Sequence, residues 1–182
     1  MKKNERVKKF GEVMTPPKVV SQMLDILDED SFENPDVVFF EPTCGDGAFV
    51  VQILERRMEA FYKQGRSIKE SITLAVSNLW AIDVQLDNID KCRKRAMDTV
   101  EKFLEKCLEG KKDGLVNERI FLQIIWHTII YQIHQNEMIT ALCKTEDEAR
   151  KKSKQTIVSR KWFDDGRWKP LEFSKGYLDK YL

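Results

Sequence analysis

Two glycines that follow an apolar run constrain this chain most. Residues 37–40 read Val-Val-Phe-Phe, and the chain continues as Glu41-Pro42-Thr43-Cys44-Gly45-Asp46-Gly47. The apolar run is too short for a helix and rich in β-forming residues, so it predicts a buried strand that ends at Glu41. Apolar residues then recur at helical spacing from Phe49 to Leu54. The sequence therefore predicts a strand, a tight glycine turn and a helix, a corner suited to a nucleotide-like ligand.

The turn lacks the features of two common nucleotide motifs. A dinucleotide fingerprint needs a third glycine where this chain has Val50, and a phosphate-binding loop needs Gly-Lys-Ser/Thr, which the sequence does not contain. Carboxylates at Glu41 and Asp46 would repel a pyrophosphate, but they suit a ligand that carries positive charge beside an adenosine. S-adenosylmethionine has sulfonium and ammonium groups of this kind, so we expect it as the cofactor.

Three segments carry a resemblance to a known family. In chain order they are Gly11–Pro16 (GEVMTP), Glu41–Phe49 (EPTCGDGAF) and Trp80–Val84 (WAIDV). They resemble the N-terminal motif, the cofactor loop and the following strand of the adenine-N6 DNA methyltransferases of restriction-modification systems, a group allied to type I modification subunits. The resemblance covers the first half of the chain, to Arg95.

The resemblance implies a fold, a cofactor and a substrate. The fold is α/β, a shortened, doubly wound and mostly parallel sheet of the class I S-adenosylmethionine-dependent methyltransferase (Rossmann-like) type, followed here by an irregular, aromatic-rich C-terminal segment. In that family the N-terminal motif touches the methionine moiety of the cofactor, and the acid that ends the second strand binds the ribose hydroxyls. DNA is the implied substrate. The implied cofactor-binding residues are Val13, Met14, Thr15, Pro16, Glu41, Pro42, Cys44, Gly45, Gly47, Phe49, Asp83 and Val84.

Position alone also favours Asp83. Residues 79–84 predict a second parallel strand, and ligands of doubly wound sheets gather beyond the carboxyl ends of the strands. The alternative is that Asp83 caps the helix that begins near Leu86.

The catalytic loop of the family is missing. That loop has the form Asn/Asp/Ser-Pro-Pro-Tyr/Phe; its polar groups hold the target amine and its aromatic ring stacks on a flipped base. The one Pro-Pro pair here is Pro16-Pro17, followed by Lys18, and after Pro42 the one proline is Pro170. We therefore assign no catalytic residue. Three hypotheses remain: an enzyme completed by a second chain, an inactive cofactor-binding module that acts through a partner, and a truncated remnant.

The remaining sequence predicts two parts, a cofactor-binding core over residues 1–135 and a C-terminal part over 136–182. In the core we expect helices over residues 16–27, 48–62, 68–77 and 87–108, the third with a capping box formed by Ser67 and Glu70. Residues 120–126 predict a third strand. In the C-terminal part we expect a charged helix over 136–154 and a hairpin around Asp164-Asp165-Gly166. Its aromatic residues either pack on the edge of the sheet or form a base-stacking platform.

Charge and composition bear on partners and location. The chain has 31 basic and 30 acidic residues, whereas proteins that hold duplex DNA unaided carry a basic excess. We therefore expect DNA contact that depends on a partner subunit, in a homo- or hetero-oligomer. Basic clusters near the N-terminus and over 150–161 are either DNA contacts or solvated faces. No run of about 18 apolar residues occurs, so we expect no membrane contact and a cytoplasmic location.

The cysteines and histidines show no metal-ligand spacing. Cys44, Cys92, Cys107 and Cys143 are scattered, with no Cys-x-x-Cys pair, so we expect reduced thiols and no metal site. The two histidines, at 127 and 134, are expected to be partly buried structural residues.

Overall fold

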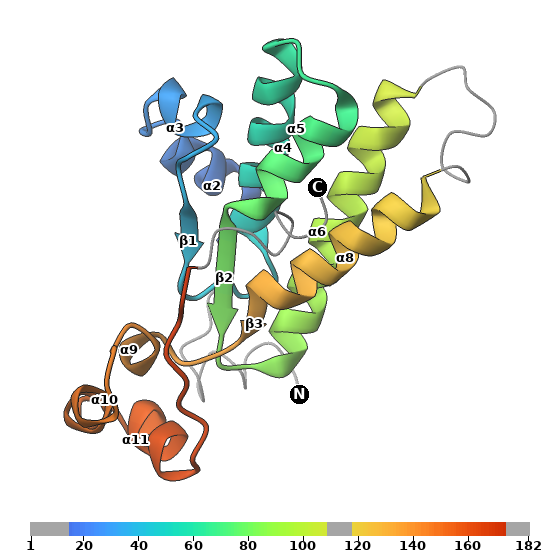
Figure 1. The fold of residues 1–182 in the computed structure, drawn as a ribbon. Coiled ribbons are helices and arrows are strands. Elements are labelled where there is room, and N and C mark those ends of the chain that lie inside the picture. The colour runs from blue at the N-terminus through green and yellow to red at the C-terminus, as the bar shows by residue number, and fades with distance from the viewer. Residues whose placement is uncertain (1–14, 109–117, 174–182) are drawn as a thin grey trace.

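The computed structural model describes residues 15–108 and 118–173. Its strands are β1 (Phe39–Glu41), β2 (Leu79–Asp83) and β3 (Ile133–Gln135), which form one parallel sheet in the order β1-β2-β3 (Figure 1). Its helices are α2 (Pro17–Leu24), α3 (Glu29–Glu33), α4 (Ala48–Lys63), α5 (Ile68–Ser77), α6 (Leu86–Cys107), α8 (Arg119–Gln132), α9 (Met138–Ala141), α10 (Glu146–Ser153) and α11 (Ile157–Asp164). This part of the chain is therefore a mixed α/β structure built on an open parallel sheet.

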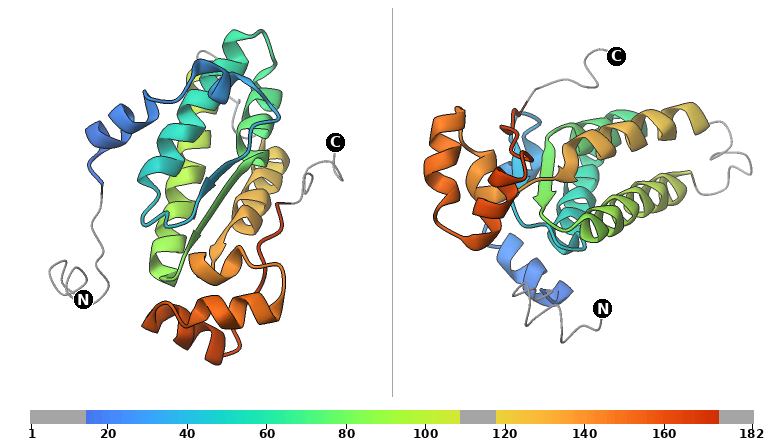
Figure 2. Two further views of the ribbon diagram at one scale, coloured as in Figure 1. Left: turned by 90° about the vertical axis from the view of Figure 1, so that its left-hand side faces the viewer. Right: turned by 90° about the horizontal axis from the view of Figure 1, so that it is seen from below.

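The main core lies between the sheet and four helices. Successive residues of a strand point to opposite faces, so Leu79 and Ala81 of β2 share one face of the sheet. Both are buried, and they belong to a hydrophobic cluster with apolar residues of α4, α5, α6 and α8. Figure 2 shows these helices together on one side of the sheet. This packing fixes the positions at which β1 and β2 end.

The opposite face of the sheet is covered by aromatic residues. The ring of Phe173 lies 5.1 Å from that of Phe40 and 5.7 Å from that of Trp80, measured between centroids. Tyr131 of α8 packs on the same indole at 5.6 Å. Phe173 therefore packs on the sheet, as one interpretation of the aromatic C-terminal segment predicted, but on a face and not on the edge. Tyr177 and Tyr181 lie outside the described residues.

The local signals in the core predicted its elements closely. Helices α4, α5 and α6 and strand β2 lie within a residue or two of their predicted bounds, and β1 is the short strand that ends at Glu41. Ser67 and Glu70 form the predicted capping box, with both reciprocal hydrogen bonds present. Helix α2 begins one residue later than predicted: Pro16 is its N-cap, and Pro17 is its first residue.

The third strand was predicted in the wrong place. Residues 119–132 form helix α8, and the strand that pairs with β2 is the three-residue segment that follows it. A continuous apolar run fits a buried strand and a buried helix equally well. The buried residues of α8 are Ile125, Thr128, Ile129 and Gln132, which follow the helical spacing of three and four.

The C-terminal part is helical where we predicted one long helix and a hairpin. Residues 136–154 contain two helices, α9 and α10, and Thr145 caps α10 through a capping box. The expected hairpin is helix α11, and Gly166, with φ of 68°, follows its end. We call α9, α10 and α11 the helical unit. Figure 2 shows this unit on the side of the sheet away from the core helices; the division of the chain at residue 135 stays a prediction.

Hydrogen bonds tie the segment that follows α11 to Asn136 and to α9. The side-chain amide of Asn136 donates to the carbonyl of Lys169 at 3.2 Å. The backbone amide of Leu171 donates to the carbonyl of Ala141 at 2.8 Å. The segment after α11 therefore returns along α9 to the sheet.

Across residues 15–108 and 118–173, none of the helices has both the length and the apolar character needed to cross a bilayer.

Candidate functional site

The glycine turn after β1 lies against the end of β2. The amide of Cys44 donates to the carbonyl of Ile82 at 2.9 Å, and the amide of Gly47 closes the turn on the carbonyl of Cys44 at 2.8 Å. Gly45 and Gly47 have φ of 53° and 91°, in the left-handed region that favours glycine. Two glycines are therefore required for the turn to follow this path.

Gly47 is also required by the helix behind it. A Cβ at this position would lie 2.8 Å from the sulfur and 3.1 Å from the Cα of Cys92, in α6. Real Cβ atoms do not approach other atoms so closely, so α4 begins in direct contact with the backbone of α6. The absence of a side chain at Gly47 thus allows the glycine turn to lie directly against α6.

Asp83 binds both the glycine turn and the start of α6. One carboxylate oxygen accepts from the amide of Gly45 at 3.1 Å, and the other accepts from the amide of Gln85 at 2.7 Å. The side chain of Asn88 approaches the second oxygen at 3.5 Å. The structure therefore brings together Gly45 and Asp83, two of the residues that the resemblance assigned to the cofactor. Asp83 does not cap α6, because the N-cap is Gln85 and receives no side-chain cap hydrogen bond.

Glu41 ends the neighbouring strand and has a perturbed pKa. Burial raises the pKa of this carboxyl above its ordinary value, and the charge of Asp83 raises it further, while hydrogen bonds from the amide and hydroxyl of Thr43 lower it. Since Glu41 pairs with Ala81 in the parallel register, Glu41 and Asp83 end adjacent strands at the same edge. A cation placed here would relieve the repulsion between the two carboxylates.

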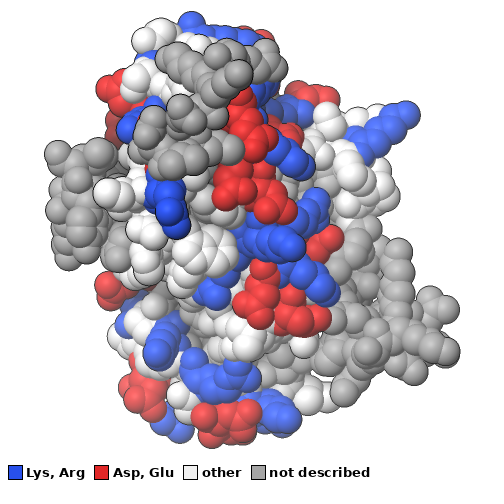
Figure 3. Space-filling model, turned by 90° about the vertical axis from the view of Figure 1, so that its right-hand side faces the viewer, with Lys and Arg blue, Asp and Glu red and all other residues white. Residues whose placement is uncertain are grey.

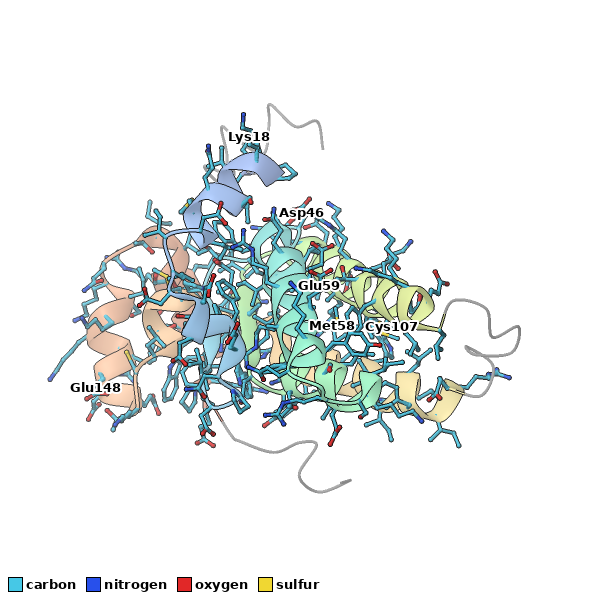
Figure 4. All side chains as sticks on the ribbon, turned by 90° about the horizontal axis from the view of Figure 1, so that it is seen from above. Lys18, Asp46, Met58, Glu59, Cys107 and Glu148 are labelled. Atoms are coloured by element: carbon cyan, nitrogen blue, oxygen red, sulfur yellow. The ribbon has the colours of Figure 1, made fainter. Side chains whose placement is uncertain are left out.

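Asp46 pairs with a cationic side chain of the protein itself. Its carboxylate pairs with Arg95 of α6 at 2.8 Å, and the same guanidinium nitrogen donates to the carbonyl of Asp46 at 3.0 Å. Figure 4 shows Asp46 at the start of α4, on the same side of the molecule as Lys18. Arg95 therefore holds the glycine turn closed, and Asp46 is committed to that contact.

The other predicted cofactor residues lie at four places in the chain. Pro42 and Phe49 flank the turn and are half-buried. The carbonyl of Val84 accepts from the side-chain amide of Gln135 at 2.8 Å. Thr15 and Pro16 precede α2, whose first carbonyl, that of Pro17, accepts from Gln52 of α4 at 2.8 Å. The remaining two, Val13 and Met14, lie outside the described residues.

The cysteines near the turn are thiols. Cys44 is buried beside Cys92, and the hydrogen bond between the two thiols and the burial of Cys44 both raise the pKa of Cys44. All four cysteines are free, and the described part of the chain contains no group of three or more His, Cys, Asp or Glu side chains able to hold a metal ion. His134 is partly buried, as expected, and burial lowers its pKa. The same expectation was wrong for His127, which is exposed on α8.

Sequence reasoning missed Asn136. This buried residue donates its backbone amide to the carbonyl of Asp83 at 3.1 Å and its side-chain amide to the carbonyl of Lys169. It thereby joins the end of β2 to the segment that returns from the helical unit. Its position directly after β3 was hidden because we had placed the third strand elsewhere.

Comparisons of the chain with family models, with curated proteins and with solved structures gave no match. The functional interpretation therefore depends on the geometry of the site and on the motifs that carry the resemblance.

Proposed function

We propose that the chain binds S-adenosylmethionine at the strand ends marked by Glu41 and Asp83. The observation that carries the proposal is the hydrogen bond from Gly45 to Asp83, which places a glycine turn and two carboxylates at one edge of a parallel sheet. Ligands of open α/β sheets bind at such an edge. The fold we propose is accordingly a shortened relative of the class I methyltransferase fold.

The residues present fit the chemistry of this cofactor. Asp83 stands where an acid can accept hydrogen bonds from ribose hydroxyls, and Glu41 supplies negative charge for an ammonium or sulfonium group. Burial, and to a lesser extent the charge of Asp83, raises the pKa of Glu41, so a cationic group bound beside this carboxyl would favour its charged form. When bound, S-adenosylmethionine supplies an electrophilic methyl group.

We further propose that the methyl acceptor is adenine in DNA, by analogy with the family that the three motifs resemble. The chain has no proline-aromatic loop after Pro42, so the groups that hold the adenine amine would come from a second chain. The same observation favours a second candidate function, an inactive module that binds S-adenosylmethionine and acts through a partner.

Titration calorimetry tests the cofactor proposal directly. S-adenosylmethionine and its demethylated product should both bind the wild-type chain, and Asp83→Asn should weaken binding about 5- to 150-fold, which is about 1–3 kcal/mol. Asp90→Asn is the matched control, because Asp90 is an exposed acid of α6 away from the glycine turn. Absence of heat with both ligands would remove both candidate functions.

Transfer of a radiolabelled methyl group separates the two candidates. The isolated chain should label neither duplex nor single-stranded DNA. If labelling appears only after a partner subunit is added, the chain is the cofactor-binding part of an enzyme; labelling by the chain alone would show that its acceptor site is complete.

A further inference from the structure

Helices α10 and α11 form a tightly joined pair. Three residues, 154–156, connect them, and the hydroxyl of Thr156 caps α11 by accepting from the amide of Ser159 at 2.9 Å. The buried positions of the pair are mostly small: Ala149, Ser153 and Ser159 are almost fully buried. Small residues allow close packing, so the pair is a short two-helix unit with a defined turn.

Positive charge is concentrated around that turn. Between Ala149 and Phe163 the chain carries six basic residues and no acidic residue: Arg150, Lys151, Lys152, Lys154, Arg160 and Lys161. All six are exposed. The same two helices carry Glu146, Asp147 and Glu148 in the first turn of α10 and Asp164 at the end of α11. The positive charge is therefore local to the turn between the helices and does not extend over the whole pair.

Most of these cations have no acidic partner in the described structure. Arg150 pairs with Glu146 at 2.7 Å and lies over the ring of Phe163, but no ion pair involves Lys151, Lys152, Lys154 or Lys161 among the described residues. On the side of α6 and α8 the cations are interleaved with acids (Figure 3). Lys91 and Lys106, for example, bind Asp87 and Glu59. The basic surface of the pair is thus free to neutralise an external anion.

The first turn of α11 adds exposed apolar groups to this surface. Ile157 is 86% exposed and Val158 is 51% exposed. A groove of about 410 Å³ lies between α10 and α11 and is lined by Arg150, Ser153, Lys154, Arg160, Phe163 and Asp164. Helix-turn-helix proteins read DNA with the first residues of their second helix, whose apolar side chains can contact thymine methyl groups.

We propose that the α10–α11 pair binds duplex DNA. Lys151, Lys152 and Lys154 would contact phosphates, and the first turn of α11 would face the major groove. This inference deepens the proposed function and rests on its DNA substrate, since it names the surface that holds that substrate. Asn136 links the helical unit to the end of β2, so DNA bound there would be held at a fixed position relative to the Glu41–Asp83 edge.

Fluorescence anisotropy with a short labelled duplex tests the surface. In the full chain, the triple variant Lys151→Gln/Lys152→Gln/Lys154→Gln should weaken binding at least about tenfold and reduce the slope of log K against log salt concentration by about 3. Lys91→Gln/Lys94→Gln/Lys102→Gln removes the same charge from exposed positions of α6. This control should retain most of the affinity, and circular dichroism should show that both variants fold.

Four results would overturn the proposal: no binding of duplex DNA by the wild-type chain at low salt, equal losses in the two triple variants, tighter binding of single-stranded RNA than of the duplex, or equal binding of poly-L-glutamate in place of a nucleic acid. Calorimetry on the α10–α11 variant should give the wild-type affinity for S-adenosylmethionine. Loss of cofactor binding in every protein, with DNA binding lost only in this variant, would reject the proposed function and keep the DNA surface.

Discussion

The backbone amide of Gly45 donates a hydrogen bond of 3.1 Å to the carboxylate of Asp83, 38 residues further along the chain. This single contact ties the turn after β1 to the end of β2. Because the same carboxylate also accepts from the amide of Gln85, Asp83 organises the site before any ligand is bound.

Asp83→Ala should lower the free energy of unfolding by about 2 kcal/mol, because two backbone amides lose a charged acceptor. Asp83→Asn keeps one acceptor oxygen and should cost about half as much. Urea unfolding measures both values. Asp90→Ala, at an exposed position of α6, should change stability by less than about 0.5 kcal/mol. If Asp90→Ala cost as much as Asp83→Ala, the loss would come from removing a negative charge and not from the two hydrogen bonds.

Gly47→Ala should destabilise the protein by about 3 kcal/mol, since it combines a strained positive φ with a Cβ 2.8 Å from the sulfur of Cys92. Gly65→Ala is the matched control. Gly65 has φ of 85°, but a Cβ there would meet nothing within 4 Å. Gly65→Ala should therefore lower the free energy of unfolding only through backbone strain, by about 1 kcal/mol, as measured by thermal or urea unfolding. Equal losses for the two variants would mean that α6 moves away without cost.

Glu41→Gln should stabilise the unliganded protein at neutral pH. Burial, and to a lesser extent Asp83, raises the pKa of Glu41 above 4.5, so the folded state holds this proton more tightly than the unfolded state. The stability that Glu41 contributes is therefore fully present below the unfolded pKa and is lost as pH rises through the folded pKa. The glutamine side chain of the variant does not titrate, so the variant escapes this loss.

The measurement for this prediction is urea unfolding of both proteins as a function of pH. The difference in free energy of unfolding between Glu41→Gln and wild type should grow as pH rises from about 4 to about 7. A difference that stays constant over this range would contradict the pKa direction. Glu55→Gln, on α4, serves as the control for the substitution itself.

Arg57→Ala should cost about 3 kcal/mol in urea unfolding. The guanidinium is fully buried, donates to the carbonyls of Ser31 and Asn34 at 3.2 and 3.4 Å, and lies near the rings of Phe39 and Phe61. Arg57→Lys should be more stable than Arg57→Ala but less stable than wild type, because an ammonium cannot reproduce the planar guanidinium that donates to two carbonyls.

The control for Arg57 is its neighbour. Arg56 is partly exposed and pairs with Asp25 at 2.7 Å, so Arg56→Ala should cost about 1 kcal/mol or less. If the two arginines behaved alike, the buried guanidinium would not be the group that holds α3 against α4.

Sequence alone predicted the helices and strands whose ends are marked by local residues, such as a capping box or flanking polar residues. Helix α5 has its capping box at Ser67, and β2 is a short apolar run bounded by polar residues. Helix α8 was mistaken for a strand because residues 120–126 form a largely apolar run, which fits both structures. Its helical spacing includes Thr128 and Gln132, polar residues that are buried with hydrogen-bond partners. Thr128 donates to the carbonyl of Ile124, and Gln132 donates to the carbonyl of Ser77.

Gly166 shows why the C-terminal part was misassigned. An Asp-Asp-Gly sequence between apolar residues is typical of a hairpin turn, yet a glycine with positive φ also follows the ends of helices. Here the amides of Gly166 and Arg167 bond the carbonyls of Phe163 and Trp162, which closes the last turn of α11. The choice between the two depends on packing against α9 and α10, which no local pattern reports.

Some contacts of the candidate site could be predicted from the sequence, and others could not. The proximity of Glu41, Gly45 and Asp83 follows from two strand ends in one parallel sheet, so the sequence could predict it. The contacts made by Arg95 and Asn136 depend on how α6 and β3 are placed in space, so residue type and spacing could not reveal them.

The chain leaves the sheet at Asn136 and returns at Lys169, and these two residues are joined by one hydrogen bond. The segment between these two residues, which contains α9, α10 and α11, therefore begins and ends at neighbouring points. Segments with such neighbouring ends can be exchanged without altering the framework that carries them. A short flexible bridge could therefore replace α9–α11, or a foreign helical pair could be grafted in their place, while the three strands keep their register.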